Sequence, residues 1–261
     1  MPPTRSRGRL SRDVVVHAAI ELLDEHGERG LTFKLLTEKL QTGAGAVYWH
    51  VANKDELVTM ATDQVIGTAL AGLSAEPGTD AETRIRALAL AVYDTLDLHT
   101  WAAPHVTAVH TMPHTMLLLE RIGGLLAETQ LPAGRHFAVA TAIFIYLTSV
   151  TAQDAGRASA AAPGTTRDDL LRQEAQQWAA LDPQTFPFVT GIAADLGNHD
   201  DRDQFLTGLD LLLDGLRSQV SATSDPAKDQ VILAEGDTSR PHDADLARAD
   251  MTERRRQIAG R

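Results

Sequence analysis

Apolar side chains recur every three or four positions along most of the chain, which is the spacing of one face of an α-helix. Val15, Ala18, Leu22 and Leu23 follow this spacing after Ser11, a residue type that caps helices well. Further helices are expected at 80–99, 113–131, 132–157 and 200–220, and a polar helix is expected at 166–181. We therefore expect an all-α protein.

Between residues 11 and 57 the pattern breaks into three short helices that lead into a longer fourth one. Thr32 is placed to cap the second helix, and a turn at 41–43 leads into a third helix expected at 44–50. Asn53 and Glu56 then have the spacing of a capping box at the start of the fourth helix. Short helices in this order predict an N-terminal helix-turn-helix domain, joined through the long fourth helix to a helical body.

Two helices of the body carry apolar side chains on more than one side. A helix of this kind needs two neighbours, which suggests one face in the core of the protomer and one against a second copy. The side chains expected at such a dimer interface are Phe137, Phe144, Phe205, Leu209, Leu212, Leu213 and Leu216.

The chain divides by composition into four parts. Residues 1–10 are expected to be a flexible basic arm, and 11–57 the helix-turn-helix domain. Residues 58–221 are expected to form a helical dimerisation domain, and the polar stretch 222–261 to be a disordered tail. The arm either contacts DNA or is merely a solvated end, and the pattern leaves both readings open.

The net charge of −11 at first argues against a nucleic-acid partner, but its distribution changes that conclusion. Basic and acidic residues balance over positions 1–60, so the negative charge lies in the rest of the chain. Arg5, Arg7 and Arg9 stand in a stretch without acidic residues. Because salt screens charges beyond about 10 Å, such an arm can bind phosphate despite an acidic body.

Cysteine is absent, which excludes disulfides and thiolate chemistry and fits an intracellular protein. No signal peptide and no long uninterrupted apolar run is evident, so we expect a cytoplasmic protein without a membrane partner.

The third helix has the composition of a DNA-reading helix. Gly43, Ala44, Gly45 and Ala46 have almost no side-chain bulk, which allows close approach to DNA and contact of alanine methyl groups with thymine. Tyr48 and His50 offer hydrogen bonds, and Lys34 and Lys54 offer charge on either side of the groove. For Trp49 a place in the core and a place on DNA are equally expected.

The stretch from residue 11 to 57 resembles the DNA-binding region of the TetR family of bacterial transcriptional repressors. The resemblance rests on Gly27-x-x-Gly30-Leu31-Thr32 and on Val47-Tyr48-Trp49-His50-Val51-x-Asn53-Lys54. The second string is similar to the tetracycline-repressor branch. Phe205-x-x-Gly208-Leu209 resembles the start of the last helix of that branch. Gln41 and Thr42 depart from the family, which has Gly and Val in this turn.

The resemblance implies roles for individual residues. Thr32, Lys34 and Lys54 would contact phosphate, residues 43–46 would enter the major groove, and residues 48–50 would face DNA. It also implies operator DNA as partner, a homodimer, and a small apolar or aromatic effector that releases the DNA. Residues 58–221 would then be the ligand-binding domain as well as the dimerisation domain.

Polar side chains on the apolar helices of the body are the candidates for binding this effector. They are His105, His110, His114, Arg121, Thr141, Phe144, Tyr146, Thr148 and Trp178, where Phe144 adds an aromatic wall. His110 and His114 are four positions apart, but Pro113 interrupts the helix and no third ligand is evident. We expect no metal and no cofactor, although the tetracycline branch binds its drug with magnesium.

Two rival functions remain. An enzyme is disfavoured because the chain has no nucleophile elbow, no phosphate loop and no recognisable pair of catalytic carboxylates. A DNA-binding or adaptor protein without an effector is the alternative, but a large helical body exceeds what a DNA clamp needs.

Overall fold

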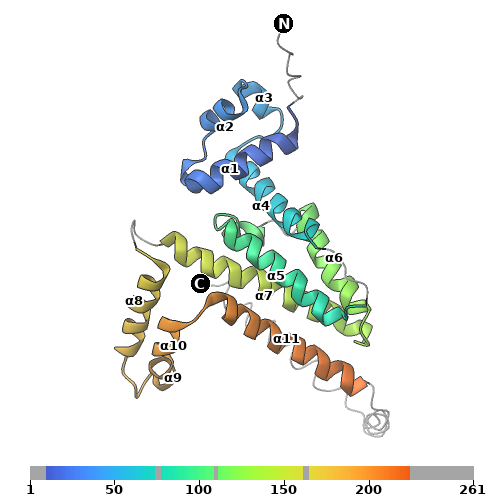
Figure 1. The fold of residues 1–261 in the computed structure, drawn as a ribbon, viewed down its shortest axis with the longest axis vertical. Coiled ribbons are helices and arrows are strands. Elements are labelled where there is room, and N and C mark those ends of the chain that lie inside the picture. Colours follow the sequence, from blue (N-terminus) through green and yellow to red (C-terminus); the bar gives the residue numbers. More distant parts are fainter. Residues whose placement is uncertain (1–9, 74–77, 109–110, 161–164, 224–261) are drawn as a thin grey trace, which may run out of the picture. The chain divides into compact units, whose positions relative to one another are not determined.

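The computed structural model describes residues 10–73, 78–108, 111–160 and 165–223. Residues 1–220 group into one compact unit, and the description below concerns that unit. The described residues form helices and no strand, which confirms the all-α prediction (Figure 1). The elements are α1 (Arg12–Gly30), α2 (Phe33–Leu40), α3 (Ala44–Tyr48), α4 (Lys54–Ala71), α5 (Ala81–Leu98), the 3-10 helix η1 (Ala103–Ala108), α6 (Pro113–Ala127), α7 (Ala133–Ala160), α8 (Arg167–Ala179), α9 (Pro187–Gly191), α10 (Ala193–Asn198) and α11 (Asp201–Thr223). Almost all of the predicted arm and of the predicted tail lies outside the described residues.

The predicted caps of the first helices are confirmed. The side-chain oxygens of Ser11, Thr32 and Asn53 each accept a hydrogen bond from a backbone amide in the first turn of α1, α2 and α4. The predicted capping box is different in one respect, because the Glu56 carboxylate accepts from the amide of Ala52 at 2.7 Å. The Glu56 side chain therefore binds the residue before the cap, Ala52, whereas a capping box would bind the amide of the cap residue Asn53.

The third helix is shorter than predicted and ends at Tyr48. The amide of His50 bonds to the carbonyl of Val47 at 2.9 Å, so the chain tightens into a turn after Tyr48. This turn leads directly into α4.

The described chain has two apolar cores that share helix α4 (Figure 1). Leu57 and Ala61 belong to the core of the head, which we define as α1–α3 with the first turns of α4. Val65 and Ile66, one to two turns later, belong to the core of the body, which is α5–α11 with the rest of α4. Helix α4 therefore connects the core of the head to the core of the body.

The dimer prediction needs a correction on α11. Four of its predicted side chains, Phe205, Leu209, Leu213 and Leu216, are buried in the core of their own protomer and have almost no surface left for a partner. All four belong to the core of the body. Phe205, for example, stacks on Tyr93 of α5, with ring centroids 4.4 Å apart.

Helix α11 approaches α7 closely at Gly208. The hydroxyl of Tyr146 on α7 donates to the carbonyl of Phe205 at 2.9 Å, directly beside this glycine. A Cβ atom at Gly208 would collide with the Tyr146 hydroxyl and ring. The absence of a side chain therefore sets the spacing of the two helices.

We expect Gly208→Ala to lower the free energy of unfolding by about 1–3 kcal/mol, because α7 and α11 must separate to admit the methyl group. Gly123→Ala in α6 is the matched control, since a Cβ there meets nothing within 4 Å. Urea unfolding at equal protein concentration measures both. Equal behaviour of the two variants would contradict the packing account.

Candidate functional site: a nucleic-acid interface on the head

Helix α3 presents a bare surface. Residues 43–46 are all exposed, while Val47 and Val51 behind them are buried in the head core. A Cβ atom at Gly43 or Gly45 would meet nothing within 4 Å, and neither glycine has a positive φ. Neither packing nor backbone conformation within the protein requires glycine at these two positions. The small residues leave the backbone of α3 accessible to a partner.

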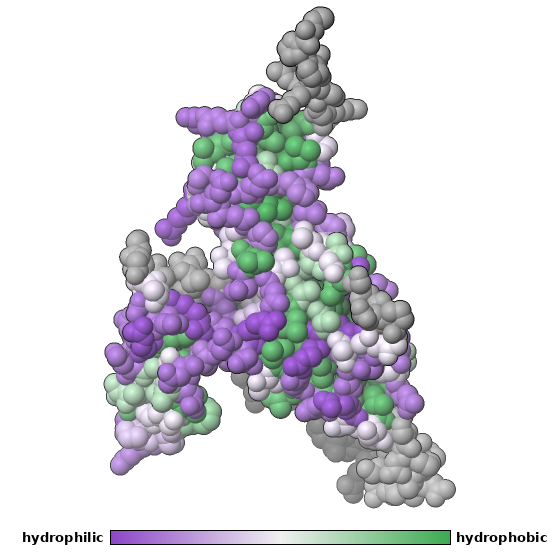
Figure 2. All heavy atoms as spheres, viewed as in Figure 1, coloured by the Kyte–Doolittle hydropathy of each residue, from purple (hydrophilic) through white to green (hydrophobic). Residues whose placement is uncertain are grey.

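Two aromatic side chains stand at the end of this bare helix. Trp49 is 86% exposed and Tyr48 is 53% exposed, so the reading of Trp49 as a core residue is wrong. Tyr48 stacks on Phe33 of α2, with ring centroids 4.6 Å apart and an interplanar angle of 11°. The stack fixes the direction of the Tyr48 ring. Figure 2 shows hydrophobic residues (green) among hydrophilic ones (purple) on the face of the head that is turned to the viewer.

The predicted phosphate-binding residues differ in their availability. Thr32 is exposed, and Lys34 is the freest cation of this set, with its side chain 85% exposed and its ammonium 4.0 Å from Glu38. Lys54, in contrast, donates to the carbonyl of Glu28 at 2.5 Å and so holds the end of α1. An ammonium group has three donors, so Lys54 can still contact a phosphate. His50 is half-buried, and Arg5, Arg7 and Arg9 lie outside the described residues.

The head is tied to the body by side chains that the sequence did not suggest. Asp24 Oδ1 of α1 accepts from Trp101 Nε1 and lies next to His99 Nδ1, both at 2.7 Å. His105 Nε2 lies 2.9 Å from Glu28 Oε2. These partners are separated by more than 70 positions in the sequence, so no local pattern could have identified them. His105 is thus part of the junction with the head.

Helix α6 is capped by a residue of another helix. Asp63 of α4 is buried, and its carboxylate accepts from the amides of His114 and Thr115, at 3.2 and 2.9 Å. The His114 ring nitrogen and the Thr115 hydroxyl also lie within 3.0 Å of it. The ring of His114 rests over Gly67, where a Cβ atom would lie 2.8 Å from it. The candidate effector residue His114 therefore joins α6 to the helix that carries the head.

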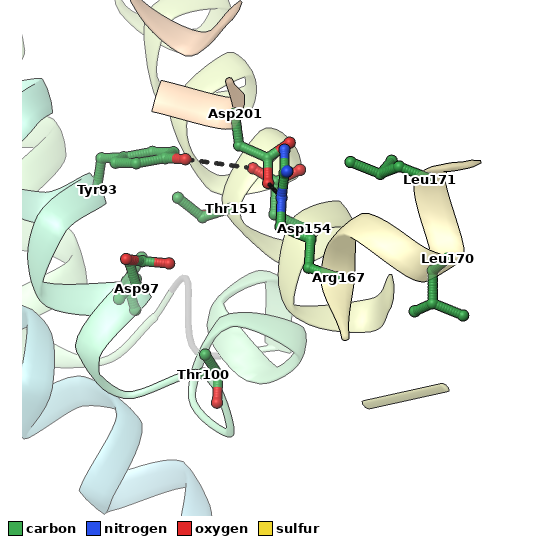
Figure 3. Close-up of a pocket in the computed structure, with 10 residues that line it drawn as sticks. Tyr93, Asp97, Thr100, Thr151, Asp154, Arg167, Leu170, Leu171 and Asp201 are labelled. Carbon is green, nitrogen blue, oxygen red and sulfur yellow. Dashed lines mark hydrogen bonds and ion pairs between the residues drawn. The ribbon is translucent and has the colours of Figure 1, made fainter. Parts of the chain in front are cut away.

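A small cavity of about 90 Å³ lies among α5, α7, α8 and the start of α11 (Figure 3). The Arg167 guanidinium donates to Asp201 Oδ2 at 2.5 Å, and His199 Nε2 lies 2.9 Å from Asp201 Oδ1. Burial alone would raise the pKa of Asp201, but the hydrogen bond and charge of Arg167 and His199 outweigh burial and hold it below its ordinary value. Burial and the nearby carboxylate of Asp154 raise the pKa of Tyr93. This network ties α8 to α11.

The depressed pKa predicts a loss of stability in acid. A carboxyl whose folded pKa is lowered stabilises the folded state above its ordinary pKa of 3.8, and this contribution disappears as the pH falls through the folded value. We expect the free energy of unfolding of the wild type to fall more steeply than that of Asp201→Asn as the pH drops below 3.8. Urea titrations at several pH values measure this, and equal slopes would contradict it.

The other predicted effector residues do not converge on one cavity. Thr141 and Thr148 donate to carbonyls of their own helix, and Tyr146 bonds to α11. Phe144 packs against the body core, and Trp178 is half-buried on α8. Arg121 lines a larger cavity, and His110 lies outside the described residues. In the described part of the chain, no group of three His, Cys, Asp or Glu residues could hold a metal ion.

Sequence comparison identifies relatives of both the head and the body. Residues 15–60 match the family model of bacterial regulatory proteins of the tetR family, and residues 74–220 match that of the tetracyclin repressor-like C-terminal domain. An HTH-type transcriptional regulator of Saccharopolyspora erythraea is 37% identical over 100 residues, which are 38% of this chain and 42% of that protein. The class D tetracycline repressor protein of Escherichia coli is 48% identical over 50 residues, 19% of this chain and 23% of the repressor. The matches thus span less than half the length of these relatives.

Solved structures extend the similarity to the body. The transcriptional regulator SCO7222, a TetR from Streptomyces coelicolor, is 34% identical, with 81% of this chain and 99% of that chain covered and a TM-score of 0.67. ActR of the same organism, in complex with actinorhodin, shares the fold at 24% identity and a TM-score of 0.66, with 81% and 98% covered. Because the C-terminal family model alone spans more than half of the sequence, the chain belongs to the TetR family of bacterial regulatory proteins.

Proposed function

We propose that the protein is a dimeric repressor that binds operator DNA through α3 and releases it when a small molecule binds the body. The observation that carries the proposal is the surface of α3, where four exposed small residues are followed by the exposed Tyr48 and Trp49. A surface this bare lets the helix approach the floor of the major groove, and alanine methyl groups can contact thymine methyl groups there.

The flanking residues would set the position of the head on the duplex. Thr32 and Lys34 lie at the start of α2, where backbone amides favour phosphate. Lys54 and the arm residues Arg5, Arg7 and Arg9 would add charge, while Tyr48 and His50 would supply polar contacts. Since phosphate contacts position a protein and base contacts specify the sequence, specificity would depend on residues 43–50.

The dimer would form on the outward face of α7 and α11. Phe137 is 80% exposed and Leu211 is 69% exposed, and Ile145 is also exposed. A hollow lined in part by Val139 and Leu212 lies between the two helices. The stretch Ala133–Asp154 is long and apolar enough to span a membrane, with 28% of its most apolar window buried. A second copy of the chain would cover this exposed apolar surface equally well. A dimer also suits a regulator whose operator DNA has two half-sites.

We expect Leu211→Asp to shift the protein from dimer to monomer, because the new carboxylate would be buried without a partner at the interface. Leu98→Asp, at an equally exposed position at the end of α5, is the control and should stay dimeric. Sedimentation velocity at micromolar concentration measures the mass of each. A monomeric wild type, or a dimeric Leu211→Asp, would overturn this interface.

The effector would be a small molecule with an apolar or aromatic body, and the protein would act in the bacterial cytoplasm without catalysing a reaction. Its DNA complex should dissociate when a matching compound is added, which a gel-shift screen over a compound library detects. Release by no compound, together with tight operator binding, would favour the alternative of an effector-independent DNA-binding protein.

A further inference from the structure

A hollow of the body that is lined by two arginines lies between the end of α4 and the helices α5 and α6. Its volume is about 380 Å³, which lies within the range of small-molecule sites. Leu73, Leu88 and Leu125 give it apolar walls, and Arg84 and Arg121 bring two guanidinium groups to it. The hollow thus combines an apolar surface with positive charge.

Helical spacing explains why these groups meet. Arg121, Leu125 and Glu128 follow one face of α6 at intervals of four and three residues, and Arg84 and Leu88 follow one face of α5 at an interval of four. Gly124 lies on the same side of α6, and a Cβ there would meet nothing within 4 Å. Glycine inside a helix costs about 1 kcal/mol relative to alanine, and packing does not require it here. Its effect is to keep the hollow open.

The two arginines differ in how their charge is balanced. Arg84 donates to Glu128 at 2.5 Å, so this pair is neutral. Arg121 is half-buried, and its contact among the described residues is a neutral one, the carbonyl of Leu70 at 2.8 Å. No carboxylate of a described residue forms an ion pair with it. A partly desolvated cation without a counter-ion in an apolar hollow favours the binding of an anion.

We propose that this hollow binds a small amphipathic anion, a carboxylate on an apolar chain or ring, with the carboxylate on Arg121 and the apolar part on the three leucines. The Leu70 carbonyl belongs to the last turn of α4, the helix shared with the head. The guanidinium has five donors, so it can hold the carboxylate and the Leu70 carbonyl together, and binding changes how α6 holds α4. This last step rests on the proposed function, whereas binding of the anion does not.

Octanoate and 1-octanol are matched probes because they share the apolar chain and differ in charge. Calorimetric titration of the full-length protein without DNA should show saturable binding of octanoate, and binding of 1-octanol should be about tenfold weaker or more. Arg121→Gln should weaken octanoate binding by a similar factor. Arg86→Gln, which removes a guanidinium of α5 that pairs with Asp210 outside the hollow, should leave it unchanged.

Gly124→Leu is a second variant that fills the hollow and leaves the Arg121 side chain in place, because Gly124 lines the hollow and a Cβ atom there meets nothing within 4 Å. It should abolish octanoate binding while the melting temperature of the protein without octanoate does not fall, so it separates binding from any folding defect of Arg121→Gln. Equal affinity for octanoate and 1-octanol, or full octanoate binding by Arg121→Gln or Gly124→Leu, would overturn the site. If octanoate binds as expected but does not release operator DNA, the site stands and its role as effector site fails.

Discussion

Replacing Asp63 by alanine is expected to lower the free energy of unfolding by about 2–4 kcal/mol, measured by urea unfolding at fixed protomer concentration. The carboxylate is 4% exposed and is the shared acceptor for four donors of His114 and Thr115. Its removal leaves the first turn of α6 without a cap, because Met112 at the cap position has no side-chain hydrogen bond of this kind. The loss is large because one side chain serves both a helix end and a helix–helix contact.

Asp63→Asn and Asp55→Ala distinguish two causes of this loss, the missing hydrogen-bond acceptor and the missing negative charge on α4. Asparagine keeps one oxygen as an acceptor, so it should cost clearly less than alanine. Asp55 stands in the first turn of the same helix α4 on the surface, and its replacement should change the stability by less than about 1 kcal/mol. A loss for Asp55→Ala as large as that for Asp63→Ala would show that charge on α4 matters and the cap does not.

Replacing Tyr48 by alanine is expected to weaken operator binding by about tenfold to hundredfold, measured by fluorescence anisotropy at constant salt. The ring is half exposed and held by Phe33, so its hydroxyl has a fixed position beside the bare surface of α3. The alanine variant loses both the contact and the orientation.

Tyr48→Phe keeps the stack and removes the hydroxyl, so it shows which part matters. If the hydroxyl contacts DNA, Tyr48→Phe should lose most of the affinity that Tyr48→Ala loses, with the stability of the head unchanged. An alanine variant that binds operator DNA like the wild type would place the DNA contact elsewhere on the head.

Local signals predicted the head well. Ser11, Thr32 and Asn53 cap the helices as their residue types suggest, because a cap depends on neighbours within three positions. The periodicity also located α5, α6, α7, α8 and α11 of the body, but it missed the short helices α9 and α10. It could not choose between the two apolar faces of α11, because a buried face and a partner face have the same composition. Phe205 and Leu209 turned out to be core residues for this reason.

The contacts that couple parts of the chain could not be predicted. Asp24 meets Trp101, and Asp63 meets His114, across separations of more than 50 positions. Each of these residues alone resembles an ordinary surface or core residue. The polar residues predicted to form one effector site are likewise dispersed in the structure. The sequence shows which apolar helices carry polar side chains, but it does not show which of these side chains lie close together in space.

The salt dependence of DNA binding tests the central proposal most directly. The DNA flanking the gene of this protein serves as the probe, and the association constant is measured by anisotropy over a range of salt concentrations. The proposal predicts specific binding whose logarithm falls linearly with the logarithm of salt, by about 0.9 per phosphate contact, with a slope smaller by about one contact per head in Lys34→Ala. Absence of binding at low salt, or binding that does not change with salt, would contradict it.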